Sequence, residues 1–169
     1  MLISVGGHHA LRIMLDLALH CDESPVFRHM ISERQGISPD YIAQICGKLS
    51  KAGLVKSTMG PDGGYGLSKS ASEIRIGDII HAIESPPATT YCIAPGKNIS
   101  CNQLENCTTH HFLLELSNVV ETYLNSVTLE DLCGRTEKLE HLASFQYLPP
   151  MTEKLTAAAS AVNNPETSP

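Results

Sequence analysis

The chain of 169 residues contains no tryptophan, and only 5% of its residues are aromatic. A packed core must therefore consist mainly of aliphatic side chains. The sequence has no run of about 18 consecutive apolar residues, which excludes a membrane-spanning helix. Its apolar start, residues 1–21, lacks the basic segment of a secretory signal and is interrupted by His8, His9, Arg12 and Asp16. We therefore expect a cytoplasmic protein with no membrane partner.

An excess of positive charge is also missing, because the formal net charge is −6. The charge is distributed unevenly. Residues 1–70 contain seven Lys and Arg and six Asp and Glu, a net charge of +1, whereas residues 71–169 contain five and twelve, a net charge of −7. If the first half binds nucleic acid, a few well-placed cations must do so, because no strong overall field is available.

Signatures of catalysis are absent too. The chain has no His-Glu-x-x-His motif, no Gly-x-Ser-x-Gly nucleophile elbow and no arrangement of paired carboxylates for acid–base chemistry. We therefore expect a protein that is not an enzyme.

The first half of the chain has the pattern of a helix–turn–helix. Apolar residues recur at helical spacing over 8–20, and a short helix is expected over 27–34, closed by Gly36. Ser38 and Pro39 are typical of the N-cap and first position of a further helix, which should end near Lys51. Two helices joined by so tight a turn predict a DNA-binding motif.

The segments that follow predict a wing and a long helix. Two short extended runs flank the Gly- and Pro-rich residues 59–64, which indicates a β-hairpin. Another helix is expected over 74–83, and a strongly amphipathic one over 108–126 is too long to bury its apolar face within so small a domain. Pairing with a second copy of the chain would cover it. A short terminal turn or helix is expected over 128–132.

These patterns predict a mainly α fold with a small β wing: a winged helix–turn–helix plus a long dimerisation helix. The expected organisation is a DNA-binding domain over 1–84, a cysteine-containing loop over 85–110, and the dimerisation helix with a terminal turn over 111–133. Residues 134–169 are expected to form a largely disordered extension, because the chain beyond about Ser144 is rich in Ala, Ser, Thr, Asn and Pro.

The candidate DNA-binding residues lie on the second helix of the motif and on the wing. Gln can pair with adenine in the major groove, and Lys can reach phosphate or guanine. The alternative is an ordinary solvated helix face. The candidates are Ser38, Pro39, Asp40, Tyr41, Gln44, Lys48, Lys51, Lys56, Ser57, Thr58, Gly60, Gly63 and Gly64.

Six cysteines are present, and three of them form the pattern Cys92-x8-Cys101-x5-Cys107-x2-His110. Because no secretory signal precedes them, a metal or redox role is favoured over a disulfide framework. Three thiolates and an imidazole suit zinc or an iron–sulfur cluster. A structural zinc site with His111 would resemble a CCCH finger, but residues 93–106 lack the aromatic residues that such fingers use to bind bases. A cluster-free thiol switch is the other alternative.

Four stretches of the chain, residues 14–19, 31–38, 60–65 and 127–132, together resemble the IscR family of iron–sulfur cluster regulators, grouped with NsrR and RirA. The resemblance covers about residues 1–133. It implies a homodimer crossed by the long helix, and a cluster held by the three cysteines. It also implies transcriptional control in response to cluster status, iron, nitric oxide or oxidant. Two copies would bind a pseudo-palindromic double-stranded DNA operator.

The resemblance implies two possible fourth ligands. In IscR the ligand is a histidine that corresponds to His110, whereas in the NsrR branch it is a carboxylate from the partner subunit's first helix, at the position of His8 here. Histidine ligation favours a 2Fe–2S over a 4Fe–4S cluster. The gap before Cys101 is longer than in IscR. Met59 and Ala43 replace the wing arginine and the helix glutamate of IscR, so we expect a different DNA target.

Overall fold

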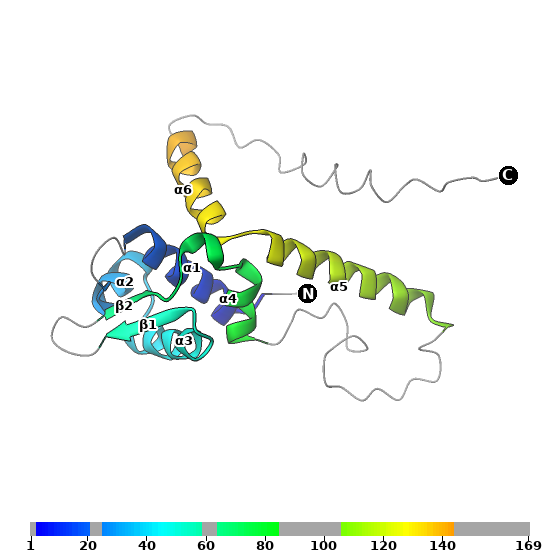
Figure 1. The fold of residues 1–169 in the computed structure, drawn as a ribbon, viewed down its shortest axis with the longest axis horizontal. Helices are drawn as coiled ribbons and strands as arrows, with labels where there is room; N and C mark the ends of the chain where they lie inside the picture. The colour runs from blue at the N-terminus through cyan, green and yellow to red at the C-terminus, as the bar shows by residue number, and fades with distance from the viewer. Residues whose placement is uncertain (1–2, 21–24, 59–63, 85–105, 144–169) are drawn as a thin grey trace. The chain divides into compact units, whose positions relative to one another are not determined.

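The computed structural model describes residues 3–20, 25–58, 64–84 and 106–143 (Figure 1). For residues 137–143 it describes the backbone only. The chain divides into two compact units, Met1–Arg135 and Thr136–Pro169. The elements are, in order, α1 (Val5–His20), α2 (Arg28–Gln35), α3 (Pro39–Lys51), β1 (Val55–Thr58), β2 (Gly64–Leu67), the 3-10 helix η1 (Ala71–Glu73), α4 (Ile76–Ile83), α5 (Thr108–Ser126) and α6 (Leu129–Ala143).

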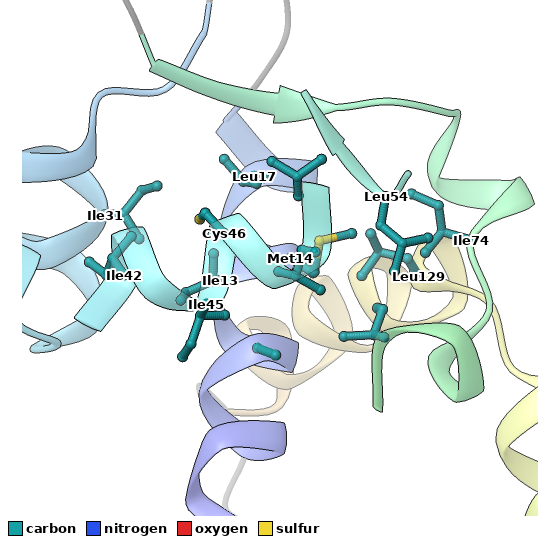
Figure 2. Packing of buried hydrophobic residues seen from close by; sticks show 14 of the residues in the cluster. Ile13, Met14, Leu17, Ile31, Ile42, Ile45, Cys46, Leu54, Ile74 and Leu129 are labelled. Carbon is teal, nitrogen blue, oxygen red and sulfur yellow. The ribbon is translucent and has the colours of Figure 1, made fainter. Parts of the chain in front are cut away.

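Helix α1 is the centre of the core. Its residues Ala10, Ile13, Met14 and Leu17 recur at helical spacing and are fully buried. The helix packs against α2, α3, α4 and β2. Figure 2 shows the aliphatic cluster around these side chains, to which α1, α2, α3 and α4 contribute buried residues, while Tyr65 and Leu67 of β2 pack against it. The expected aliphatic core is confirmed.

The helix–turn–helix has the predicted start and end signals. Gly36 follows α2 in a left-handed conformation with φ of 64°, and its amide donates to the Ser32 carbonyl at 2.9 Å. Glycine adopts this conformation without the steric cost that a β-carbon brings. Ser38 and Pro39 open α3 as expected, although the Ser38 side chain makes no capping hydrogen bond. The start of α3 therefore depends on Pro39 and on the acidic Asp40 in its first turn.

The predicted hairpin is confirmed as two antiparallel strands, β1 and β2, which pair Val55 with Leu67 and Thr58 with Gly64. The tip of the wing, residues 59–63, lies outside the described residues. A third extended segment joins the sheet, because Val26 and Tyr65 exchange two backbone hydrogen bonds of 2.8 and 2.9 Å. This bridge was not expected from the sequence.

The second half departs from expectation at two helix ends. Helix α4 begins at Ile76, not Ile74, because residues 74–76 pair in extended conformation with residues 127–129. The short turn or helix expected over 128–132 is the start of the longer helix α6, so residues 134–143 of the expected extension are helical. A reciprocal cap explains this start: the Thr128 hydroxyl accepts from the Asp131 amide, and the Asp131 carboxylate accepts from the Thr128 amide, both at 3.0 Å.

Residues 144–169 lie outside the described part of the chain, and so does most of the expected cysteine loop, residues 85–105. Within the described ranges, no helix is both long enough and apolar enough to cross a membrane.

Candidate DNA-binding surface and metal-ligand positions

Helix α3 separates a buried apolar face from an exposed polar one. Its buried residues are Ile42, Ile45, Cys46 and Leu49. The opposite face exposes Asp40, Gln44, Lys48 and Lys51, which follow one another at helical spacing as a single stripe. A helix held by one face and exposing hydrogen-bonding side chains on the other has the geometry needed to enter a major groove. Ser38 and Pro39, at the start of α3, are also exposed.

Tyr41 differs from the other candidates on α3, because it is only partly exposed and packs against the core. Its ring meets the His9 ring edge to face, with 5.6 Å between the centroids. A β-carbon at Gly6 would lie 3.5 Å from the Tyr41 hydroxyl. Tyr41 therefore connects the first turn of α3 with the first turns of α1.

The wing contributes exposed side chains from β1. Lys56, Ser57 and Thr58 are exposed, whereas Val55 is buried. Gly60 and Gly63 lie outside the described residues. Gly64 has a structural reason for lacking a side chain, because a β-carbon there would lie 2.6 Å from the carbonyl oxygen of Val26.

An ion pair between the buried Asp16 and the partly exposed Arg34 anchors the helix–turn–helix to α1. Asp16 is 1% exposed, and its carboxylate accepts two hydrogen bonds from the Arg34 guanidinium, at 2.8 and 2.7 Å. The Gln35 amide donates a third at 2.9 Å, and Arg12 donates to Gln35 in turn. Burial alone would raise the pKa of Asp16, but the hydrogen bonds from Arg34 and Gln35 and the charge of Arg34 outweigh it, so this pKa is lowered.

The ion pair between Asp16 and Arg34 was not predicted from the sequence, although the position of Asp16 indicated that it needs a partner. Asp16 lies next to Leu17 on the face of α1 that the core covers. A carboxylate at such a position needs a buried partner, because an unpaired buried charge is strongly unfavourable. The sequence did not show which cation supplies it.

Two of the candidate metal ligands lie together at the start of α5. Cys107 is the N-cap residue of this helix, and its sulfur accepts a hydrogen bond from the backbone amide of His110 at 3.4 Å. The His110 ring lies 5.7 Å from the ring of His111. A helix N-terminus favours negative charge, which suits a thiolate ligand, and a sulfur and an imidazole in one helical turn suit zinc or an iron–sulfur cluster.

The remaining candidate ligands are not brought together by the described residues. Cys92 and Cys101 lie outside them. His8 is on α1, is exposed, and stacks on His9 with 6.0 Å between ring centroids. No group of three or more potential metal ligands occurs within the ranges that the structure describes.

The other two described cysteines lie on α3 and α6. Cys46 is fully buried in α3, and burial raises the pKa of its thiol to about 12. A thiol so protonated is a poor nucleophile and a poor metal ligand, so Cys46 is a core residue. Cys133 is partly buried in α6.

Comparisons with known proteins agree with this fold. Residues 3–135 match the Rrf2 family, described as "Iron-dependent Transcriptional regulator". The chain is 41% identical over 140 residues to the HTH-type transcriptional regulator IscR of Pectobacterium carotovorum subsp. carotovorum (strain PC1), which covers 83% of this chain and 84% of the relative. The IscR of Vibrio atlanticus (strain LGP32) is also 41% identical over 140 residues, covering 83% and 79%.

Two solved structures are similar as well. CymR, the global cysteine regulator of B. subtilis, is 31% identical with a TM-score of 0.67, covering 80% of this chain and 98% of that one. The IscR of T. potens is 33% identical with a TM-score of 0.66, covering 82% and 90%. The predicted resemblance to IscR and the predicted winged-helix class are confirmed.

Proposed function

Because the chain belongs to the Rrf2 family of iron-dependent transcriptional regulators, we propose that it is a homodimer whose affinity for a DNA operator responds to an iron–sulfur cluster. That it is an IscR-like, DNA-binding transcriptional regulator follows from the family and its relatives. The homodimer, the cluster and the residues of both sites are the proposal. The observation that carries it is the position of Cys107 and His110 at the start of α5, whose other end contacts α4.

The DNA is bound by α3 in the major groove and by the wing in the adjacent minor groove. Gln44, which is exposed on α3, would form hydrogen bonds with base edges, and the exposed Lys48 and Lys51 would contact phosphates. Lys56 adds a cation on the wing. Few cations contribute, so the affinity depends less steeply on salt than in strongly basic DNA-binding proteins.

The second copy of the chain covers the exposed apolar stripe of α5. Phe112, Leu116, Val119 and Tyr123 lie on one face of this helix and are 62, 41, 60 and 47% exposed. Nineteen residues make the helix roughly 28 Å long. A symmetric pairing of two such stripes buries both at once, and it presents two α3 helices to two half-sites of a palindrome.

The cluster is held by Cys92, Cys101 and Cys107, with His110 as the fourth ligand or His8 of the partner subunit in its place. A 2Fe–2S cluster is favoured over a 4Fe–4S cluster. When bound, the cluster supplies redox and nitric oxide chemistry, and the protein residues hold it and connect it with α5. It can change DNA affinity only by stabilising one arrangement of the dimer more than another, typically by about 1–3 kcal/mol, or roughly 5–150-fold.

Anaerobic purification tests this proposal, with visible absorbance and with assays of iron and sulfide. We expect a coloured protein with bound iron and sulfide, and loss of that absorbance in Cys107→Ala. Cys46→Ala is the matched control and should keep it. Colourless protein with stoichiometric zinc would contradict the cluster, and a redox-dependent DNA affinity in iron-free protein would favour the thiol switch.

The fourth ligand is identified by comparing His110→Ala with His8→Ala. Loss or change of the native absorbance in only one of them assigns the ligand. If both variants keep the spectrum, neither histidine binds the cluster.

A further inference from the structure

We propose that the contact between α4 and α5, here called the α4–α5 joint, sets the spacing at which the dimer binds its two half-sites. The joint consists of Gly77 and His81 on α4 and of Glu121 and Asn125 on α5. The joint would thus contribute to the choice between DNA operators without contacting any DNA base. This inference rests on the proposed homodimer.

The side chains of the joint make two contacts between the helices. In the first contact, the His81 ring donates from Nε2 to the Glu121 carboxylate at 3.2 Å. In the second, Asn125 lies against Gly77 so closely that a β-carbon at Gly77 would overlap its side-chain oxygen. The Asn125 amide also donates a hydrogen bond to Glu121 at 2.9 Å, which connects the two contacts.

Backbone hydrogen bonds hold the end of α5 at the same place. The Ile76 amide donates to the Val127 carbonyl at 3.0 Å, and the Leu129 amide donates to the Ile74 carbonyl at 2.9 Å. Both Val127 and Leu129 are buried in the core. The C-terminal end of α5 is therefore held against α4 by side chains and by main chain.

Helix α4 transmits the position of α5 to the DNA-binding surface. Its residues Ile76, Ile79 and Ile80 are buried, and it packs against both α1 and α3. A rotation of α5 relative to α4 is thus a rotation of α5 relative to α3.

The joint lies on the side of α5 opposite to the apolar stripe. At 100° per residue, Glu121 is roughly 180° around the helix from Phe112. Each α5 therefore has its own α4 on one side and, in the proposed dimer, the partner's α5 on the other. The α5 pair fixes the two-fold axis, and the joint fixes where each α3 lies relative to that axis, so the joint decides the distance between the two α3 helices.

Selection from a pool of random DNA duplexes tests the inference, because such a pool contains half-site pairs at every spacing. Wild-type protein should select paired half-sites at one spacing. His81→Ala/Glu121→Gln should select the same half-site sequence at several neighbouring spacings. With duplexes built from the selected sequence, adding one base pair between half-sites should weaken wild-type binding roughly tenfold or more, and binding of the variant about threefold or less.

Two controls separate the joint from other effects. Glu115→Gln removes one carboxylate from α5 away from α4 and should keep the sharp spacing. Gln44→Ala should change the selected half-site sequence and leave the spacing unchanged. Because His81 and Glu121 are partly exposed, their replacement should cost little stability, which far-UV circular dichroism and thermal unfolding would check.

A second pair of variants gives an independent test. Gly77→Ala displaces the Asn125 side chain, and Asn125→Ala removes it together with its hydrogen bond to Glu121, so each should broaden or shift the spacing. If wild-type protein selects no paired half-sites, the proposed dimer fails and the joint with it. If wild-type protein selects one spacing and the folded joint variants select the same one equally sharply, only the role of the joint is overturned.

Discussion

Helices α1 to α4 and the wing are here called the head. The head buries apolar side chains against other parts of the same chain, whereas α5 leaves several of its large apolar side chains exposed. The head buries aliphatic side chains from each of its helices and connects α1 with α2 through the Asp16 carboxylate. In α5, as the structure describes it, only Ser117 is fully buried, while large apolar side chains are exposed. The head is therefore packed within the chain itself, with Val127 and Leu129 added to its core, whereas α5 exposes an apolar stripe.

This comparison predicts that substitutions in the head change stability and that substitutions on the stripe of α5 change association. The first test is Asp16→Ala, which leaves Arg34 without its buried partner. We expect the free energy of unfolding to fall by about 3 kcal/mol, because three hydrogen bonds to a buried carboxylate are lost at roughly 1 kcal/mol each, as measured by urea denaturation at a fixed protein concentration. Glu115→Ala, on the exposed surface of α5, is the control and should change it by about 0.5 kcal/mol or less. An equal loss in both variants would contradict the assigned role of the ion pair.

The second test is Val119→Glu, which places a charge in the middle of the exposed stripe. We expect the dimer to dissociate with a dissociation constant raised roughly thirtyfold or more, which corresponds to about 2 kcal/mol, because a buried unpaired carboxylate opposes association. Analytical ultracentrifugation measures the change. Asn118→Glu, on a different face of α5, should leave the dimer intact, and a dimer that survives Val119→Glu would show that the stripe is not the interface.

The third test distinguishes the two kinds of DNA contact on α3. Gln44→Ala should lower discrimination between the selected site and a mutated one by about 1–2 kcal/mol. Lys48→Ala should weaken binding to all sequences and reduce the salt dependence by about one phosphate contact. Fluorescence anisotropy over a salt series measures both. The reverse pattern would mean that the exposed face of α3 is oriented differently on DNA.

The smallest expected effect is a loss of stability in acid. The pKa of Asp16 in the folded protein is below its ordinary value of 3.8, so the ion pair contributes fully above that value. Its contribution is lost as the pH falls from about 3.8 through the lower folded pKa. Urea denaturation between pH 5 and pH 2 should show a smaller slope of stability against pH in Asp16→Asn than in wild type. Identical slopes would mean that Asp16 does not titrate differently on folding.

Much of the head could be predicted from short segments. Gly36, Ser38 and Pro39 marked the turn and the start of α3, and the hairpin followed from its Gly-rich middle. The start of α6 was expected near residue 128, where Thr128 and Asp131 form its cap, but its continuation to Ala143 was missed.

Other features had no complete local signal. The solvent-facing side of α3 was predicted correctly for Gln44 and Lys48, but Tyr41 lies against α1, which spacing on α3 alone does not show. Gly64 was taken for a possible DNA contact, while the structure also requires it to lack a side chain beside Val26. The candidate metal site remains a prediction for all of its residues, and the described part of the chain contains only Cys107, His110 and His8 of them.

The sequence by itself determined the order of the elements and the placement of Cys107 beside His110, because caps, turns and helical periodicity depend on residues within about four positions of one another. Only the tertiary structure decided that Arg34 neutralises Asp16 and that Asn125 packs on Gly77. These partners are far apart along the chain, and no local pattern selects them. They meet because the aliphatic core holds α1, α2 and α4 together and the extended pairing of residues 74–76 with 127–129 holds the end of α5.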